Sequence, residues 1–321
     1  MKSKILFAVH RYAPFPGGSE TNVKNMAEEM LRRGHDVTVV AASQSGDHNG
    51  VKVTGDHNVL LDKWDLIIVH GGDVITQNIV HANAERLQSP VLYLIIKPSE
   101  SEICLHGLKA HKYLGYGTSF DLDLIKKYGL ENKARQVRYG LPIEDTIYPY
   151  DKSMHPFPGK RMFISIGGFA GHKRMRPLAD AFKAAKIPDA VLVILGYDGG
   201  DVPDGSENVA VAVGAPKSAV MSLVAMSDAL IMNSSEEGFG LVLLEAMMNK
   251  TPWFARDIAG AHDMSIYGTI YNTEEELMER LRAFDREKIQ IQIDAAYSYV
   301  MANHTIQTCV DDIERILSEH N

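Results

Sequence analysis

The chain has 321 residues, of which 45% are hydrophobic and 23% are charged, a composition that excludes wholesale disorder. Its formal net charge of −8 argues against a large nucleic-acid-binding surface. Because single hydrophobic cores usually stop growing below this length, we expect two domains.

The two cysteines, Cys104 and Cys309, lie far apart and lack the spacing of metal ligands, so neither a disulfide framework nor a zinc site is predicted. The basic first residues are followed by His10 and Arg11, which interrupt the apolar run before a signal-peptide core could form. No stretch approaches the roughly 20 apolar residues that span a bilayer. We therefore expect a cytoplasmic protein that lies at most at a membrane surface.

The first half of the chain alternates short apolar runs with longer amphipathic ones, a pattern typical of βαβ units and a parallel sheet. Between the first two runs, Val23, Met26 and Met30 recur at helical spacing, and Gly34 ends that pattern. The predicted strands are residues 5–9, 37–41, 66–69, 91–96 and 136–139.

A proline-rich break at residues 148–161 separates this half from a second α/β pattern. The second half has predicted strands at residues 162–168, 190–196 and 229–235 and predicted helices at residues 177–186 and 217–228, and from Glu274 onward it is mostly helical. We expect an N-terminal domain over residues 1–152 and a C-terminal domain over residues 153–302. The amphipathic helix at residues 303–321 is expected to cross back and pack on the first domain.

The predicted fold class is therefore α/β, with two doubly wound, Rossmann-like domains that face a central cleft. Ligands of doubly wound sheets bind at the carboxyl ends of the strands. Four glycine-containing turns that follow predicted strands are the candidate ligand-binding segments.

The first two turns follow the strands at residues 5–9 and 66–69. Gly17 and Gly18 leave a turn without side chains before a helix, whose N-terminus favours an anion. His70 ends the other strand, before Gly71 and Gly72, and its imidazole can exchange hydrogen bonds with a hydroxyl group.

The third turn, residues 165–177, resembles a dinucleotide fingerprint, but Ile166 occupies the position of the first required glycine. The turn instead presents Lys173, Arg174 and Arg176, a cationic cluster suited to phosphate oxygens.

The fourth turn lies in "NSSEEGFGLVLLEAMMNK", residues 233–250. Gly238 and Gly240 permit a tight backbone around Phe239, and a helix begins near Leu241, with free N–H groups ready for a phosphate. Glu245 falls on an apolar side of that helix, where a carboxylate is costly unless it is paired. A cis-diol such as a ribose would satisfy both of its oxygens.

These four turns together resemble the retaining nucleotide-sugar glycosyltransferases of family four, which have the GT-B fold. The matching segments are "GGSE" with "RRGHDVTVV", "DLIIVHGG", "VRYGLP", Lys173 after a glycine turn, "SSEEGFGLVLLEAM" and "TPWFARDIAGAHD". The most specific of them has two glutamates separated by seven residues, with Gly-Phe-Gly between them. The resemblance covers nearly the whole chain.

The resemblance implies a role for each matching residue. Glu245 would hold the ribose hydroxyls of the donor, and Glu237 would contact the transferred sugar together with His70. The diphosphate would be bound by Lys173 and by the backbone N–H groups of the fourth turn. The implied catalytic residues are Glu237, His70 and Lys173, and the implied donor-binding residues are Gly17, Gly18, Arg174, Gly238, Phe239, Gly240, Leu241, Val242 and Glu245.

The sequence departs from the family pattern at three positions. Gly168 occupies the place of an arginine that usually partners the lysine on the phosphates, with Arg174 or His172 as substitutes. Lys250 and Ala259 stand where the family tends to have glycines.

The leading function is retaining transfer of a sugar from a nucleoside-diphosphate sugar to an acceptor hydroxyl of a glycan, lipid or small molecule, with no metal or other cofactor. One alternative is transfer to a modified nucleic-acid base, which the acidic net charge disfavours. A second is a nucleotide-sugar-binding protein without turnover, motivated by Gly168, and an isomerase acting on the donor is a third. Base recognition is expected near residues 212–218. The sequence there identifies neither the base nor the sugar of the donor.

Overall fold

The computed structural model describes residues 2–42, 44–70, 74–96, 101–149, 152–197 and 200–319, without the side chains of residues 74–77 and 152. Gly71 and Gly72, predicted to follow His70, lie outside the described residues. The chain divides into two compact units, residues 1–140 with residues 304–321, and residues 141–303.

The first boundary between the units lies before the proline-rich break, whereas the sequence placed it at residues 152/153. The intervening residues are fixed to the second unit by Asn249. The amide N–H of Tyr148 donates to Asn249 Oδ1 at 2.9 Å, and Asn249 Nδ2 donates to the Thr146 carbonyl at 2.8 Å. Because these contacts join residues about a hundred positions apart, no local pattern indicates them.

The first unit is built on an eight-stranded sheet in its described residues, with the strand order β3-β4-β2-β1-β5-β6-β7-β8. All its pairings are parallel except that of β3 with β4. The strands are β1 (Lys4–Ala8), β2 (Asp36–Val40), β3 (Gly46–His48), β4 (Val51–Thr54), β5 (Leu66–His70), β6 (Val91–Leu94), β7 (Tyr113–Tyr116) and β8 (Ala134–Gln136). The helices are α1 (Gly18–Arg32), α2 (Val74–Ala82), α3 (Glu102–Ala110), α4 (Ser119–Lys127) and α11 (Ile306–Ser318).

The prediction for this unit was wrong in three places. The last strand is Ala134–Gln136 rather than residues 136–139, and both the strand β7 and the β3–β4 hairpin were missed. The strand β3 has the sequence Gly-Asp-His, which carries no apolar alternation that could indicate it.

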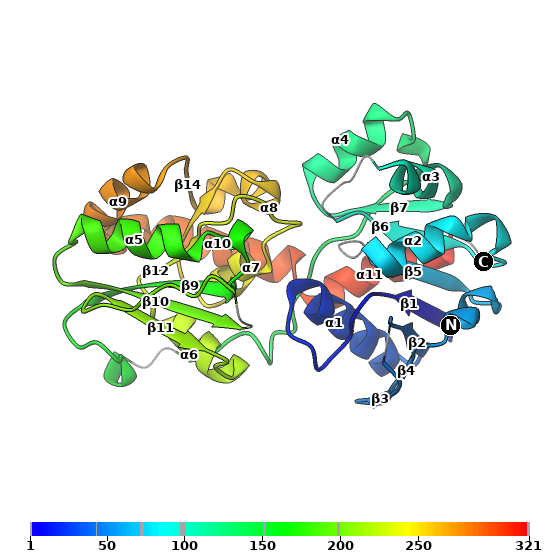
Figure 1. Cartoon of the computed structure of the whole chain (residues 1–321), viewed down its shortest axis with the longest axis horizontal. Coiled ribbons are helices and arrows are strands. Elements are labelled where there is room, and N and C mark those ends of the chain that lie inside the picture. Colours follow the sequence, from blue (N-terminus) through cyan, green and yellow to red (C-terminus); the bar gives the residue numbers. More distant parts are fainter. Residues whose placement is uncertain are drawn as a thin grey trace. The chain divides into compact units, whose positions relative to one another are not determined.

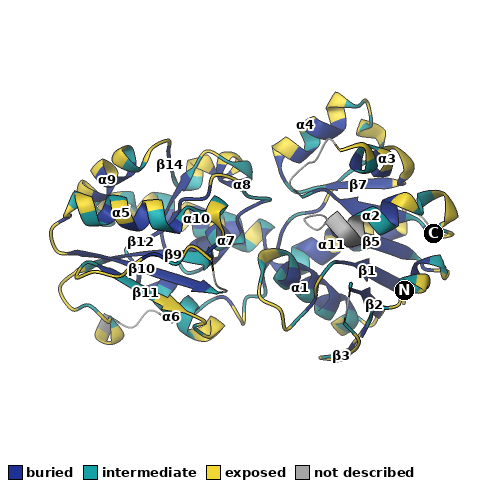
Figure 2. Cartoon of the chain, viewed as in Figure 1, coloured by how far each residue is buried: buried dark blue, intermediate teal, exposed yellow. Residues whose placement is uncertain are grey.

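Alternate residues of β1 enter two different cores, as expected for a sheet covered on both faces. Ile5 and Phe7 pack in a core with α1 and α11, whereas Leu6 and Ala8 pack in a core with side chains of α2, α3 and α4. The central strands β1, β2 and β5 are accordingly buried over nearly their whole length (Figure 2). This arrangement leaves the ends of the strands as the places where a ligand can reach the sheet.

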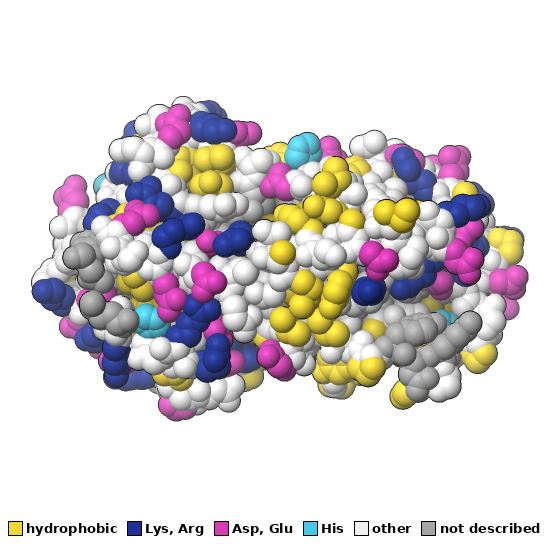
Figure 3. Space-filling view, turned by 180° about the vertical axis from the view of Figure 1, so that it is seen from behind, with side chains coloured by type: hydrophobic (Ala, Val, Ile, Leu, Met, Phe, Trp, Pro, Cys, Tyr) yellow, Lys and Arg dark blue, Asp and Glu magenta, His cyan; other side chains and the backbone are white. Residues whose placement is uncertain are grey.

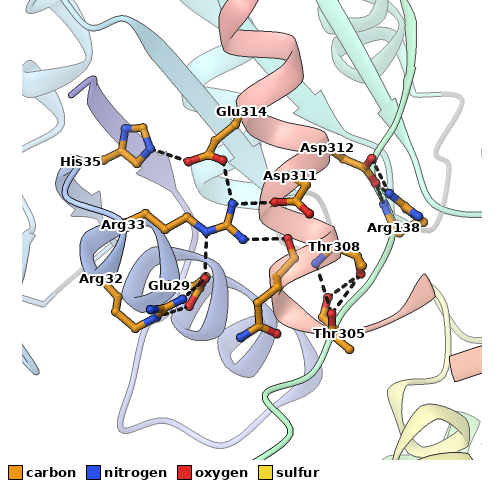
Figure 4. Close-up of polar contacts among 11 residues, drawn as sticks. Glu29, Arg32, Arg33, His35, Arg138, Thr305, Thr308, Asp311, Asp312 and Glu314 are labelled. Carbon is orange, nitrogen blue, oxygen red and sulfur yellow. Dashed lines mark hydrogen bonds and ion pairs between the residues drawn. The ribbon is translucent and has the colours of Figure 1, made fainter. Parts of the chain in front are cut away.

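The C-terminal helix α11 lies beside α1 in the first unit (Figure 1), so residues 306–318 return to the N-terminal half of the chain. Arg33, which follows α1, donates to Asp311 and to Glu314 at 2.7 Å each (Figure 4). On another side of α11, Asp312 accepts from the backbone N–H of Arg138 at 3.0 Å and from its Nε at 2.8 Å. These ion pairs supplement the apolar packing that fixes the helix.

The second unit contains a six-stranded sheet in its described residues, with the order β11-β10-β9-β12-β13-β14 and parallel pairings throughout. Its strands are β9 (Arg161–Gly168), β10 (Ala190–Tyr197), β11 (Val209–Val213), β12 (Ala229–Met232), β13 (Trp253–Arg256) and β14 (Thr269–Tyr271). Its helices are α5 (Met175–Ala185), α6 (Lys217–Met226), α7 (Leu241–Met248), α8 (Ala259–Asp263), α9 (Glu274–Arg282) and α10 (Gln290–Asn303). One core lies between the sheet and the helices α5 and α9, around Phe163, Phe182 and Leu281.

The surface of the chain carries charges of both signs. Lys and Arg side chains are interspersed with Asp and Glu side chains over the face drawn in Figure 3. In the part of the chain that the structure describes, no helix is long and apolar enough to cross a lipid bilayer.

Adjacent aspartates on α11 provide a matched test of how this helix is held. Asp312 has a side chain 3% exposed, and Asp312→Ala should lower the free energy of unfolding of the first unit by about 3 kcal/mol, because Arg138 loses its buried partner. Asp311 is 60% exposed, so Asp311→Ala should cost less than about 1 kcal/mol. Urea unfolding followed by Trp64 fluorescence in a Trp253→Phe background reports this unit, and equal losses in the two variants would contradict the assignment.

Candidate functional site

The second unit has a topological switch point between β9 and β12, which are neighbours in the sheet. From β9 the chain continues to β10 and β11 on one side, and it then returns to build β12, β13 and β14 on the other. At such a point the connections diverge at the carboxyl ends of the two central strands and leave room for a ligand. The third and fourth glycine turns follow β9 and β12, so the structure brings these two predicted segments together.

Lys173 and Glu237 join the two turns directly. The Lys173 Nζ lies 2.5 Å from Glu237 Oε1, and Ser234 Oγ donates to the same oxygen at 2.7 Å. The backbone supports this pair, since the Ser235 N–H donates to the His172 carbonyl at 2.8 Å. The side chains of Lys173 and Glu237 are 21% and 12% exposed, so they are largely enclosed by protein while still reaching solvent.

The Gly-Phe-Gly turn is fixed by close backbone packing on both sides. Gly240 has a φ of +97°, and a Cβ there would lie 2.9 Å from Met232 Sδ. Phe239 is buried, and its carbonyl oxygen lies so near α8 that a Cβ on Gly260 would come within 2.5 Å of it. The glycine positions are therefore required by geometry, because a side chain would strain the φ or clash with the backbone.

The helix α7 begins at Leu241 directly after this turn, and its N-cap residue Gly240 provides no side-chain cap. Gly238, Leu241 and Val242 are partly exposed, whereas residues 243–248 are buried. The uncapped N–H groups of the first turn carry the positive end of the helix dipole and are suited to an anion.

Glu245 is buried in α7, with 6% of its surface exposed, and Lys217 provides its partner. The Lys217 Nζ forms an ion pair with Glu245 Oε1. Lys217 is the first residue of α6 and lies within the segment in which base recognition was expected. No local sequence pattern indicates this role, because a lysine at the start of a helix carries no sign of a partner 28 residues further on.

Arg174 is engaged with protein groups rather than presented as a free cation. Its guanidinium donates to Glu274 Oε1 at 2.7 Å, and its carbonyl accepts from Asn233 Nδ2 at 3.0 Å. Arg256 holds the other oxygen of Glu274 at 2.8 Å, and Tyr271 donates to Asn233 at 2.8 Å. This network ties the carboxyl ends of β12, β13 and β14 to the residue that precedes α5. Glu274 engages only the Nη2 of Arg174, so the role of Arg174 as a phosphate ligand stays a prediction.

The same contacts lower the pKa of Glu274 and so favour its charged form. Burial raises the pKa of its carboxyl group, but hydrogen bonds from Arg174, Arg256 and Asn233 outweigh burial and lower the pKa from 4.5 to about 2. Arg176, the third cation of the predicted cluster, pairs with Asp201 and Asp204 at the surface instead.

The three positions that depart from the family pattern differ in their geometry. Gly168 is buried beside Tyr197, and a Cβ there would make ordinary contact with the tyrosine ring at 3.5 Å. Lys250 and Ala259 have φ values of +54° and +37°, a region that favours glycine. The backbone therefore retains at both positions the conformation for which a glycine is suited.

The first unit has its own switch point, between β1 and β5. His70 at the end of β5 is buried, and its Nε2 lies 3.0 Å from Nδ2 of Asn22 on α1. The turn before α1 is already occupied by a protein anion, since Glu20 pairs with Arg11 at 3.0 Å and a Cβ on Gly17 would lie 2.0 Å from Glu20 Oε2. Gly18, by contrast, has open space at its Cβ position.

Among the described residues, no group of three or more His, Cys, Asp and Glu side chains is placed to hold a metal ion.

The comparisons with known proteins agree with this architecture. Residues 150–269 match the family described as "Glycosyl transferases group 1". HepE from Anabaena, solved in complex with UDP and glucose, superposes with a TM-score of 0.79 at 15% identity and covers 99% of this chain and 100% of its own. Sucrose-phosphate synthase from Thermosynechococcus elongatus has a TM-score of 0.80 at 13% identity, with 98% of each chain covered.

WaaG, a glycosyltransferase involved in lipopolysaccharide biosynthesis, has a TM-score of 0.70 at 17% identity, with 98% of this chain and 99% of its own covered. No curated protein sequence is a significant match. At sequence identities this low, the structural similarity establishes the fold alone. It confirms the predicted GT-B class. The predicted resemblance to glycosyltransferases is confirmed by the family match over residues 150–269.

The Glu274 network predicts how the second unit responds to acid. Because the pKa of Glu274 is about 2 in the folded state and its ordinary value is 4.5, its stabilising contribution is present above pH 4.5 and is lost as the pH falls toward 2. Glu274→Gln should lower the free energy of unfolding by about 2 kcal/mol at pH 7 and flatten its dependence on pH in this window.

Urea unfolding monitored by Trp253 in a Trp64→Phe background measures this response between pH 3 and pH 7. Glu275→Gln, at an exposed neighbour, is the control and should change the free energy by less than about 0.5 kcal/mol. An unaltered pH dependence in Glu274→Gln would show that the network does not hold the carboxylate as described.

Proposed function

We propose that this chain, a GT-B protein whose residues 150–269 match the group 1 glycosyltransferases, transfers a sugar from a nucleoside-diphosphate sugar to an acceptor hydroxyl with retention of configuration. The observation that carries the proposal is the set of groups at the β9/β12 switch point. Lys173 pairs with Glu237 in the turn that precedes the uncapped start of α7, and Glu245 lies one turn into that helix.

The diphosphate is assigned to Lys173 and the N–H groups of Leu241 and Val242. A lysine ammonium and a helix N-terminus both stabilise negative charge, and that charge grows on the diphosphate as its bond to the sugar breaks. In this role the ammonium of Lys173 moves from Glu237 toward the phosphate oxygens, which releases the carboxylate for the sugar.

The sugar and the ribose are assigned to the two glutamates. Glu237, together with the backbone of Gly238, Phe239 and Gly240, accepts hydrogen bonds from hydroxyls of the transferred sugar, and Glu245 accepts them from the ribose. The complex of HepE with UDP and glucose supports a nucleotide and a sugar as ligands of this architecture.

Retention is assigned to a front-face reaction. The bond between the sugar carbon and the diphosphate oxygen breaks, the acceptor oxygen bonds to the same face of that carbon, and the acceptor's proton passes to the departing diphosphate. This route requires no covalent nucleophile from the protein and no metal ion. Lys173 and the helix dipole supply the positive charge that a metal would otherwise provide.

The first unit is assigned a hydroxyl-bearing ligand at its β1/β5 edge. His70 and Asn22 are hydrogen-bonding side chains at that edge, and Gly18 leaves its backbone accessible. A glycan, lipid or small-molecule acceptor fits this chemistry, and a cytoplasmic location, at most at a membrane surface, belongs to the same proposal.

Gly168 favours one other function, a nucleotide-sugar-binding protein without turnover. A glycine has no side chain, so this position brings no second cation to the site beside Lys173. Such a protein would bind donors as the enzyme does but would form no product with any acceptor.

Donor binding is measured by titration calorimetry with UDP, ADP and GDP and with their sugar conjugates. Lys173→Ala and Glu245→Ala should each weaken binding of the preferred nucleotide about tenfold or more, because each removes a charged hydrogen-bonding partner. Lys183→Ala, which removes a lysine from the body of α5, should leave the affinity unchanged.

The reaction itself is tested by incubating the preferred donor with glycan, lipid and small-molecule acceptors and determining the anomeric configuration of the product by NMR. A retained configuration supports the proposal. Inversion would exclude the front-face route, and tight donor binding without any product would favour the binding protein instead.

A further inference from the structure

The position of Lys217 is not explained by the stability of its own helix. It is the first residue of α6, where the helix dipole disfavours a positive charge, and the preceding Pro216 offers no side-chain cap. Its side chain is 49% exposed, yet its ammonium reaches across to α7 and pairs with Glu245. The placement of this lysine is therefore determined by the carboxylate.

The pair leaves part of the carboxylate available. Lys217 engages Oε1 of Glu245, and among the described residues no hydrogen bond to Oε2 is found. A carboxylate accepts hydrogen bonds at both oxygens, and an ammonium group has three donors, of which Glu245 takes one. A ligand arriving here meets an acceptor and a donor side by side.

A vicinal diol is complementary to such a pair. One hydroxyl can donate to Oε2 of Glu245, and the oxygen of the other can accept from the Nζ of Lys217. Hydroxyls are both donors and acceptors, so the diol satisfies the two side chains without separating them. A deoxyribose has one hydroxyl fewer and leaves one of these groups without a partner.

We propose that Lys217 is a specificity-determining residue of the donor site, which positions the Glu245 carboxylate and donates to the 2′-hydroxyl of the ribose, so that the protein selects ribonucleotides over 2′-deoxyribonucleotides. This inference rests on the proposed function, because it takes the nucleotide as the ligand of α7. It assigns to the ion pair a role that neither residue has alone.

The experiment compares UDP with 2′-deoxy-UDP by titration calorimetry on the full chain. The wild-type protein should bind UDP about tenfold or more tightly than 2′-deoxy-UDP. Lys217→Met should weaken UDP binding about tenfold and leave 2′-deoxy-UDP nearly unchanged, so that the preference collapses. Lys217→Arg retains the charge and the donors, and it should preserve most of the preference.

Lys183→Met is the matched control for loss of one lysine, and it should change neither affinity. The side chain of Lys217 is half exposed, so Lys217→Met should fold, and its melting temperature verifies this. Equal weakening of both nucleotides by Lys217→Met would mean that the lysine acts only as a general positive charge, and an unchanged preference would mean that it has no role; either result overturns the inference.

The result also separates this inference from the proposed function. If the wild-type protein binds none of UDP, ADP and GDP, both fail. If UDP binds and Glu245→Ala abolishes the preference for ribose while Lys217→Met retains it, the proposed function stands and the role of Lys217 is wrong. ADP or GDP with its 2′-deoxy form replaces the UDP pair if it binds more tightly.

Discussion

The pairing of buried carboxylates with cations from other elements is the constraint on which the second unit depends. Glu245 lies in a helix that is otherwise apolar, and a carboxylate there is tolerated because Lys217 reaches it from α6. Glu237 and Glu274 are held in the same way by Lys173 and by two arginines. Each pair joins segments that follow different strands. The ion pairs therefore fix the arrangement of the site and also neutralise the charge of its glutamates.

These pairs also connect stability with ligand binding. A carboxylate that accepts hydrogen bonds from protein groups on both of its oxygens, such as Glu274, is suited to holding turns in place. The pairs of Lys173 and Lys217 are different, because each lysine is partly exposed and retains donors that a ligand can use. At the same edge of the sheet, Asn233 and Arg174 therefore bind Glu274 within the protein, whereas the two lysines retain donors for a ligand.

Much of this site could be predicted from the sequence, because its segments are marked by local patterns. The apolar runs located β9, β10 and β12, and the Gly-Phe-Gly turn located the start of α7. The sequence also indicated that Gly240 permits a tight turn. The structure explains why a glycine is needed there, since its φ is positive and a Cβ would lie close to Met232. The nucleotide, the sugar and the retaining reaction remain proposals.

The partners of the carboxylates could not be predicted in this way. Glu245 and Lys217 are 28 residues apart, and Arg174 and Glu274 are 100 residues apart, so their meeting depends on the order of strands in the sheet. For the same reason the sequence predicted Arg174 as part of a cationic cluster for phosphate and did not indicate that its guanidinium donates to Glu274. The hairpin of β3 and β4 was missed for a different reason, since β3 is short and polar.

The most direct test of the central claim is a crystal structure of the protein with UDP, ADP or GDP, whichever binds most tightly. The account predicts the diphosphate against the first turn of α7 and Lys173, with the ribose hydroxyls on Glu245 and Lys217. A nucleotide bound away from the β9/β12 edge, or bound there with its ribose turned away from Glu245, would contradict it.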